Sequence, residues 1–323
     1  MRNGNGCSAR PVIRATTGSF ILSDKKILVL GGSGFIGRHL RARLAGQTGE
    51  DQVVATYHET PFSGGLKFDA RVESLAEVIP GLEIFSHAVI LLANAHPDDC
   101  AKNPEASRAL NVTAIKAIID QLAEGSVCPV FASTEVVFDG EKGGYVESDP
   151  VSPILLYGKQ KAEIEEYLGS RVPSALILRI ANVYGSDPAG SGVVAGWYKT
   201  VTGGAETVKC AHDYIASPVH VDDVAEAVLR LVEGKCLGTY HVAGPQPLSR
   251  LEMFETLLEE MRHSGPVDVD VVSCSIDDFS TEERRPRDIS MAVDKLVAET
   301  ALTPRNLRSA CRHLVNAAEQ TAA

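Results

Sequence analysis

The sequence predicts an α/β fold: a doubly wound parallel sheet of the Rossmann type, with a smaller C-terminal substrate-binding lobe. Short apolar runs alternate with helical segments through the first half of the chain, beginning at Ile27. Strands that are apolar along their whole length are typical of a parallel sheet covered by helices on both faces. Three glycines, Gly31, Gly34 and Gly37, follow the first apolar run at the expected turn from strand to helix.

The elements follow in order from the apolar periodicity. Strands are expected over 27–30, 52–57, 88–93, 127–133 and 175–180, and helices over 35–44, 72–79, 104–123 and 157–168. Pro104 suits the start of the longest helix, because a missing N–H costs nothing in the first turn. Beyond residue 184 the alternation is looser, with helices expected over 222–232 and 250–262 and an extended segment over 239–242.

The glycine turn predicts a dinucleotide site. Gly31 permits the tight turn, Gly34 lets the backbone approach a pyrophosphate, and Gly37 lets the helix pack closely on the sheet. The first helical residues, Phe35 and Ile36, begin a helix whose free N–H groups and partial positive charge favour a phosphate.

The end of the second strand favours NADP over NAD. That strand ends at Thr56 and Tyr57 and is followed by His58, so no acid occupies the position that would hold the ribose hydroxyls of NAD. Arg38, directly after the third glycine, and His58 are the candidate partners of a 2′-phosphate. NAD stays open as the alternative cofactor.

Three regions are expected from this pattern. Residues 1–24 form a flexible tail, 25–180 are mainly the NAD(P)-binding domain, and 181–323 are mainly the substrate-binding lobe, interleaved with that domain. The tail contains three arginines and no acid before Asp24, so a transit peptide stays open as an alternative.

Composition narrows the class of partner. The formal net charge of −11 argues against nucleic acid or an anionic membrane surface as the main partner. No apolar run approaches the roughly 20 residues of a membrane span. The seven cysteines form no Cys-x-x-Cys pair, which predicts reduced thiols, no metal site and a cytoplasmic enzyme.

A tyrosine and a lysine carry the expected chemistry. Tyr157 and Lys161 are four residues apart and share one face of the expected helix. Together with the glycine turn, this pair predicts a nicotinamide-dependent enzyme whose acid is a tyrosine. A free tyrosine has a pKa of roughly 10, and we expect Lys161 and an oxidised nicotinamide to stabilise the phenolate.

Several motifs, taken together, resemble the extended short-chain dehydrogenase/reductase family, and within it the dTDP-4-dehydrorhamnose reductase branch of sugar-nucleotide-binding proteins. The resemblance extends from about Lys26 to Leu296. It is carried by Ser-Thr-Glu-Val-Val-Phe-Asp-Gly at 133–140, by Tyr-Gly-Lys-Gln-Lys at 157–161, and by Arg-Pro-Arg at 285–287.

The resemblance implies an NAD(P)H-dependent reductase that acts on a nucleotide-linked 4-keto-6-deoxy sugar. It implies that Thr134 donates a hydrogen bond to the oxygen that Tyr157 protonates, and that Asn111 links Lys161 to solvent. It also implies cofactor contacts from Asp69, at the adenine, and from Ala93, at the end of the third strand.

The substrate side is expected to use residues from the second half of the chain. Guanidinium groups suit a diphosphate, and an indole can stack on a base or sugar. The candidates are Glu135, Asn182, Trp197, Arg284, Arg285 and Arg287.

Two other functions stay open. The first is a sugar-nucleotide epimerase or dehydratase, because an asparagine at position 182 is more typical of those enzymes. In addition, Val136 replaces a residue that borders the substrate pocket in the reductase branch. The branch also resembles the regulatory subunit of methionine adenosyltransferase, a non-catalytic NADP-binding protein. A non-catalytic function is less favoured, because the three residues expected to carry the reaction, Thr134, Tyr157 and Lys161, are all present. A homodimer is compatible with an enzyme and with a non-catalytic subunit.

Overall fold

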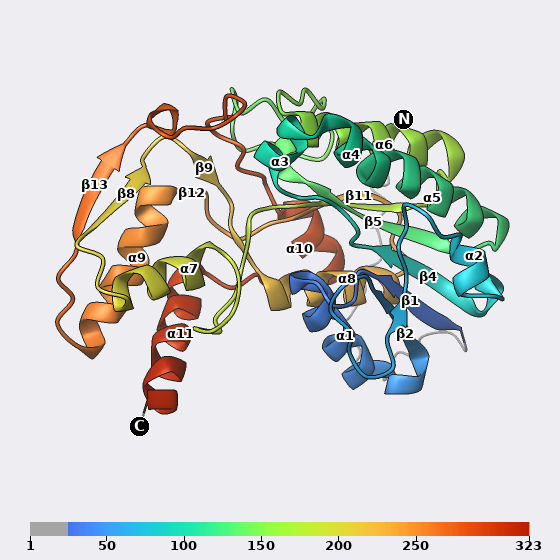
Figure 1. Ribbon diagram of the computed structural model, residues 1–323, viewed down its shortest axis with the longest axis horizontal. Coiled ribbons are helices and arrows are strands. Elements are labelled where there is room, and N and C mark those ends of the chain that lie inside the picture. Colours follow the sequence, from blue (N-terminus) through green and yellow to red (C-terminus); the bar gives the residue numbers. More distant parts are fainter. Residues whose placement is uncertain (1–24, 323) are drawn as a thin grey trace, which may run out of the picture.

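The computed structural model describes residues 25–322. A seven-stranded sheet, parallel at every pairing, forms its centre, as the sequence predicted (Figure 1). The spatial order is β11-β6-β5-β4-β1-β2-β3. The strands are β1 (Lys26–Leu30), β2 (Val53–Tyr57), β3 (Leu66–Lys67), β4 (Phe85–Ile90), β5 (Cys128–Thr134), β6 (Leu176–Ile180) and β11 (Gly238–Val242).

The order reverses at β1, which lies between β2 and β4. Ligands of open parallel sheets bind outside the carboxyl ends of the strands at such a switch point. The residues that follow β1, β4 and β5 therefore meet at one edge of the sheet.

Helices cover both faces of the sheet (Figure 1). The side chains of β1 alternate between the two layers, with Ile27 and Val29 in one apolar cluster and Leu28 and Leu30 in the other. The first cluster packs under α1 (Phe35–Thr48) and α8 (Val221–Glu233), and the second under α5 (Ile115–Glu124) and α6 (Leu156–Arg171).

The remaining elements on the sheet side are short. They are α2 (Leu75–Val78), α3 (Pro97–Lys102), α4 (Pro104–Arg108) and α10 (Asp294–Thr300). The helix expected over 72–79 is thus a single turn, and the strand expected over 88–93 ends at Ile90. The long helix expected over 104–123 is interrupted by a π-helical turn at Ala109–Ala114, between α4 and α5.

Elements of the second half of the chain build a smaller lobe beside the sheet (Figure 1). Its core contains Phe254, Leu257 and Leu314, with Trp197 packed against it. The lobe comprises α7 (Val193–Thr202), α9 (Arg250–Ser264), α11 (Leu307–Ala322) and the strand pairs β8 (Thr207–Ala211) with β13 (Asp270–Cys274) and β9 (Ile215–Ala216) with β12 (Leu248–Ser249). A further parallel pair, β7 (Val183–Tyr184) with β10 (Val219–His220), joins the lobe to the sheet domain.

Membrane spans, metal sites and the N-terminal tail were also among the expectations. Over residues 25–322, no helix combines the length and the apolar character that crossing a membrane requires. In the same part of the chain no group of three His, Cys, Asp or Glu side chains is placed to hold a metal ion. The tail expected over 1–24 lies outside the described residues.

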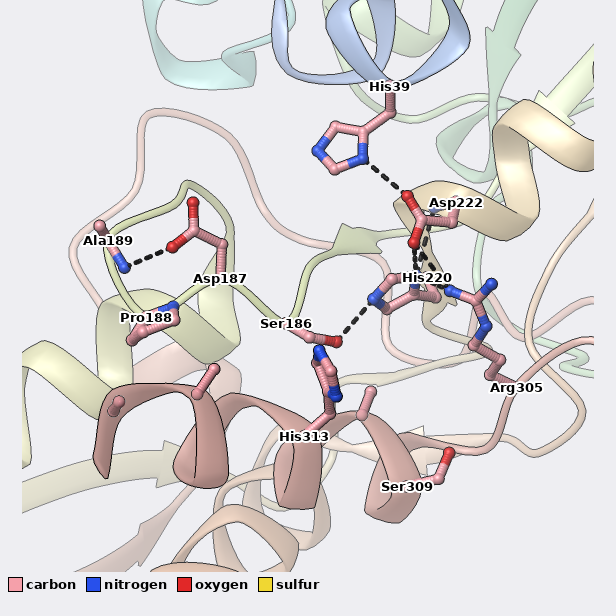
Figure 2. Close-up of a pocket in the computed structure, with 13 residues that line it drawn as sticks. His39, Ser186, Asp187, Pro188, Ala189, His220, Asp222, Arg305, Ser309 and His313 are labelled. Atoms are coloured by element: carbon pink, nitrogen blue, oxygen red, sulfur yellow. Dashed lines mark hydrogen bonds and ion pairs between the residues drawn. The ribbon is translucent and has the colours of Figure 1, made fainter. Parts of the chain in front are cut away.

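A polar cluster connects the two parts of the molecule at a cavity of about 1130 Å³ (Figure 2). Asp222 accepts a hydrogen bond from Arg305 (2.9 Å) and lies 2.7 Å from Nδ1 of His39 on α1. His220 begins α8, where its Nδ1 accepts from the backbone N–H of Asp222 (3.2 Å) and from Arg305 (2.8 Å). Its Nε2 must then carry the proton and donate to Ser186 (2.7 Å).

Burial, the largest cause, lowers the pKa of His220 to about 4, so that this imidazole is neutral in the folded protein at pH 7. The unfolded chain, with a histidine pKa near ~6.5, binds more protons than the folded protein between these two values. This group therefore stabilises the fold above about pH 6.5, and its contribution is lost as the pH falls toward 4.

We expect His220→Asn to reduce the pH dependence of stability, because asparagine keeps an N-cap acceptor but does not titrate. The free energy of unfolding of the unchanged protein should fall by about 2 kcal/mol more than that of the variant between pH 7.5 and pH 5. Urea denaturation at the two pH values measures this. Equal pH dependence of both proteins would show that His220 titrates normally.

Candidate active site

A pocket of about 490 Å³ lies at the carboxyl edge of the sheet, where the glycine turn, the ends of β5 and β6 and the start of α6 meet. It brings together many of the residues that the sequence singled out. Those lining it are Gly31, Gly34, Phe35, Ile36, Gly37, Ala93, Thr134, Glu135, Tyr157, Lys161 and Asn182.

The glycine turn is held against the end of β2. The backbone N–H groups of Gly31 and Gly32 donate to the side chain and the carbonyl of Thr56, at 3.1 and 2.7 Å. Gly31 has φ +91°, which other residues adopt rarely. A Cβ on Gly37 would overlap the carbonyl oxygen of Gly31, so only glycine lets α1 start this close to the turn.

The turn is shaped to hold a dinucleotide. Gly34 is exposed, and a Cβ there would meet only the Gly31 carbonyl, at 3.4 Å. Among residues 25–322 no side chain caps the first turn of α1, so its N–H groups stay available to a ligand. The residues present thus fit a pyrophosphate at the helix N-terminus.

Tyr157 and Thr134 meet because α6 packs directly on the backbone after β5. A Cβ on Gly158 would overlap the carbonyl oxygen of Val136. Thr134 accepts a hydrogen bond from the N–H of Val136 (3.4 Å), which leaves its own hydroxyl proton available in the pocket. Tyr157 is 8% exposed, and burial raises the pKa of its phenol above the usual value. The tyrosine therefore carries its proton.

Lys161 reaches the end of β5 rather than the tyrosine hydroxyl. Its Nζ donates to the carbonyl of Ala132 (2.7 Å) and lies 5.8 Å from the ring centre of Tyr157. Burial lowers the pKa of Lys161 to about 7, although the nearby charge of Glu165 opposes this change. The sequence interpretation expected Lys161 to favour the phenolate, but in the protein alone burial outweighs that effect and raises the pKa of Tyr157.

Asn111 lies in the π-helical turn and is 1% exposed. Its amide accepts from the backbone N–H of Asn94 (2.8 Å) and donates to the Asn94 carbonyl (3.0 Å) and to Gln160 (2.7 Å). The Asn111 amide thus bonds to Gln160, the neighbour of Lys161 on α6, and the expected link from Lys161 to solvent through Asn111 stays a prediction. Asn111 thus ties α6 to the segment after β4.

Glu135 is the buried carboxyl of the pocket. It is 4% exposed, it accepts a hydrogen bond from the backbone N–H of Asn182, and its Oε2 has no partner among the described residues. Burial raises the pKa of Glu135 to about 8, and the positive charge of Arg250 opposes this increase.

Arg250 and Tyr214 also line the pocket, and sequence reasoning did not find them. The Arg250 guanidinium donates to the side chain of Asn182 (3.2 Å) and lies 5.2 Å from the ring centre of Tyr214. Arg250 begins α9, a position that carries no motif, so only the tertiary fold reveals it.

Of the three candidate arginines near residue 285, only Arg285 lines the pocket. It pairs with Asp98 (2.8 Å), and its Nη1 is buried without a partner among the described residues. Arg284 is exposed near Glu141 (3.6 Å), and Arg287 pairs with Asp213 and Asp277. The clamp expected from Arg284 and Arg287 is therefore not formed.

Trp197 also lies away from the pocket. Its ring packs on Phe254, with centroids 5.3 Å apart, beside the core of the smaller lobe. The expected stacking on a substrate is replaced by this packing, since α7 turns its apolar face toward α9.

The adenosine end of the expected cofactor site contains both acidic and basic side chains. Asp69 pairs with Arg71 (2.9 Å) and lies 3.3 Å from His58, and the Arg71 hydrogen bonds hold the pKa of Asp69 well below its usual range. Arg38 instead lies over the ring of Phe35, 5.3 Å from its centre. Arg41 is closer to the end of β2 and was not singled out by the sequence.

Arg41 lies between the glycine turn and the loop after β2. Its Nε donates to the carbonyl of Gly32 (2.9 Å), and its guanidinium stacks on Phe62, 3.5 Å from the ring centre. This stacking fixes the guanidinium beside the turn, with its two Nη groups available. Arg41 therefore has the fixed geometry that suits a phosphate, and the expected role of Arg38 at the 2′-phosphate stays a prediction.

Comparison with known proteins gives a family match over most of the chain. Residues 25–320 match the family described as the RmlD substrate binding domain. A Haloferax volcanii protein named "Probable low-salt glycan biosynthesis reductase Agl14" is 27% identical over 76% of this chain and 83% of its own length.

Two further proteins are similar. Methionine adenosyltransferase 2 subunit beta of Danio rerio is 27% identical over 71% of this chain and 72% of its own. The crystal structure of dTDP-4-dehydrorhamnose reductase from Bacillus anthracis, in complex with NADP, has the same fold. It superposes with a TM-score of 0.77 at 20% identity, over 90% of this chain and 98% of that chain.

The close packing at the glycine turn can be tested with two substitutions in one helix. We expect Gly37→Ala to lower the free energy of unfolding by about 1–3 kcal/mol, because the new Cβ overlaps the Gly31 carbonyl. Gly46→Ala, also in α1, has nothing within 4 Å of its Cβ and should raise it by about 0.5–1 kcal/mol. Urea denaturation measures both. Equal effects would contradict the packing described.

Proposed function

The chain belongs to the RmlD substrate binding domain family, and from this premise we propose that it is an NAD(P)H-dependent reductase of a nucleotide-linked 4-keto-6-deoxy sugar. The observation that carries this proposal is the pocket that Thr134, Tyr157 and Lys161 share with the glycine turn. Among its relatives, one is named a reductase and another a dTDP-4-dehydrorhamnose reductase.

In the proposed reaction the protein supplies the proton that the carbonyl oxygen receives, and it stabilises the negative charge that develops on that oxygen. The nicotinamide cofactor supplies hydride to the carbonyl carbon when it is bound. Tyr157 gives its proton to the carbonyl oxygen, a role that its raised pKa supports by keeping the phenol protonated beforehand. Thr134 donates a hydrogen bond to the same oxygen as negative charge develops there.

Lys161 makes the loss of that proton easier. A positive charge near the ring favours the phenolate, and because burial lowers the pKa of Lys161 to about 7, this charge depends on pH in the neutral range. Its hydrogen bond to Ala132 holds the ammonium beside the end of β5, so that no movement is required during the reaction.

The substrate diphosphate is proposed to bind Arg250 and Arg285. Both guanidinium groups line the pocket on the side of the smaller lobe, and Arg285 has an unpartnered buried Nη1 there. Asn182, held by Arg250, and Glu135 complete this side of the pocket for the sugar. We further propose that the enzyme works in the cytoplasm and can form a homodimer.

A 4,6-dehydratase is a weaker candidate. Removing the C5 proton and expelling the C6 hydroxyl requires an acid and a base in addition to the tyrosine. Glu135 can supply one of these, but its neighbour Val136 lines the same pocket and cannot transfer a proton. A non-catalytic binding protein is also a weaker candidate, because it would not require Tyr157 and Thr134 in one pocket.

We expect Tyr157→Phe to lower kcat at least about 100-fold while NADPH binding stays nearly intact, because only the proton donor is removed. NADPH consumption at saturating keto sugar and fluorescence titration of NADPH measure the two effects. Tyr167→Phe is the matched control, since Tyr167 lies on the same helix but bonds to Asp120. A Tyr157→Phe enzyme within twofold of normal kcat would rule out this acid.

The proposed cofactor is NADP, with NAD as the alternative. We expect kcat/KM with NADPH to be at least equal to that with NADH, and Arg41→Gln to lower the NADPH-to-NADH ratio about tenfold through loss of a charge-assisted bond. Arg43 is on the same helix as Arg41, but it pairs with Glu226 of α8. Arg43→Gln should therefore leave the NADPH-to-NADH ratio unchanged. A strong preference of the unchanged protein for NADH would contradict this proposal.

A further inference from the structure

Glu135 differs from Glu165 and Glu260, two other buried carboxyl groups of the described part of the chain. Glu165 accepts hydrogen bonds from Arg179 and Ser133, and Glu260 pairs with Arg308 and Arg312. Glu135 forms no ion pair among residues 25–322, and one of its oxygens has no partner there. A buried carboxyl oxygen without a partner is costly, so its presence needs an explanation.

The position of Glu135 indicates what that explanation is. It directly follows Thr134 and is one of the residues that line the pocket with Tyr157, and its unpartnered Oε2 is buried there. The charged and titratable groups that line the pocket with it are Arg250, Arg285, Tyr214, Tyr157 and Lys161. Arg250 is already held by Asn182 and by the Tyr214 ring, which leaves Glu135 without a fixed cation.

A carboxylate in such a place is a base. The C–H bonds on the carbon atoms next to a ketone are acidic, because the electron pair left behind is delocalised onto the carbonyl oxygen. Thr134 and Tyr157, the two donors assigned to that oxygen above, would stabilise the resulting enolate just as they stabilise the alkoxide. The pocket therefore contains both components of an enolisation site.

We propose that Glu135 removes and returns a proton on a carbon atom next to the ketone, so that the pocket exchanges this proton as well as reducing the carbonyl. This inference rests on the proposed function, since it uses the same keto sugar. The C–H bond breaks, its proton passes to the Glu135 carboxylate, and its electron pair forms the enolate. The reverse step restores the C–H bond, so nothing is oxidised or reduced.

The exchange should proceed without inversion of the carbon. Inversion requires a second acid on the opposite face of the sugar, and Glu135 is the one carboxyl group among the described residues that line the pocket. The active form is the ionised carboxylate. Because burial raises the pKa of Glu135 to about 8, exchange should increase from pH 7 to pH 9.

The test uses the full-length protein with NADP⁺, which prevents reduction, and dTDP-4-keto-6-deoxyglucose in D₂O. We expect the NMR signal of H3 or H5 to disappear at least tenfold faster than without protein, with no new diastereomer. Glu135→Gln should return the rate to that of the protein-free sample, and Glu163→Gln, an ion-paired control on α6, should not. The pH profile of the unchanged protein gives a readout that does not depend on any variant.

Parallel measurement of NADPH consumption separates the two proposals. Reduction without exchange would overturn the role of Glu135 and leave the reductase proposal supported. Exchange without reduction would overturn the reductase proposal and leave the role of Glu135 supported. Failure of both would overturn both. Inversion of the exchanging carbon, or exchange by Glu135→Gln at the normal rate, would also overturn the proton transfer proposed here.

Discussion

The contact between Gly158 and the carbonyl oxygen of Val136 is the constraint on which the pocket depends. Since glycine has no Cβ, the first turn of α6 lies directly on the backbone that follows β5. Tyr157 is thereby brought into the pocket of Thr134, and Lys161, one turn later, reaches the carbonyl of Ala132. Any larger residue at 158 would separate the helix that carries the acid from the strand that carries its partner.

Burial of this pocket shifts three groups toward their neutral forms. It raises the pKa of Tyr157 and Glu135 and lowers the pKa of Lys161. A protonated phenol is ready to act as an acid, and the lysine charge that favours its ionisation is present only in part near neutral pH. The same desolvation thus keeps the Tyr157 phenol protonated and, through the charge of Lys161, affects how easily the phenol loses its proton.

The sequence predicted the parts of the structure that depend on local pattern. Apolar runs predicted the parallel sheet, which the structure confirms, and the spacing of Gly31, Gly34 and Gly37 predicted the turn. The chemical roles assigned to Tyr157 and Lys161 stay predictions, although both line one pocket.

The parts that failed depend on tertiary packing. Among neighbouring arginines on an irregular segment, sequence cannot tell that Arg285 faces the pocket while Arg287 pairs with Asp213. Arg250 is distant in sequence from every motif, and the π-helical turn that contains Asn111 leaves no signal in the apolar periodicity. Trp197 could be assigned only once its contact with Phe254 was known.

If the protein is a reductase, hydride passes in the pocket from a bound nicotinamide to a sugar carbonyl. NADPH stereospecifically deuterated at C4, incubated with the protein and a nucleotide-linked 4-keto-6-deoxy sugar, shows whether this transfer occurs. We expect a product with one deuterium atom on the former carbonyl carbon, detected by NMR, and one NADPH consumed for each sugar. A product without deuterium from either C4 epimer, or no product from any such sugar, would contradict it.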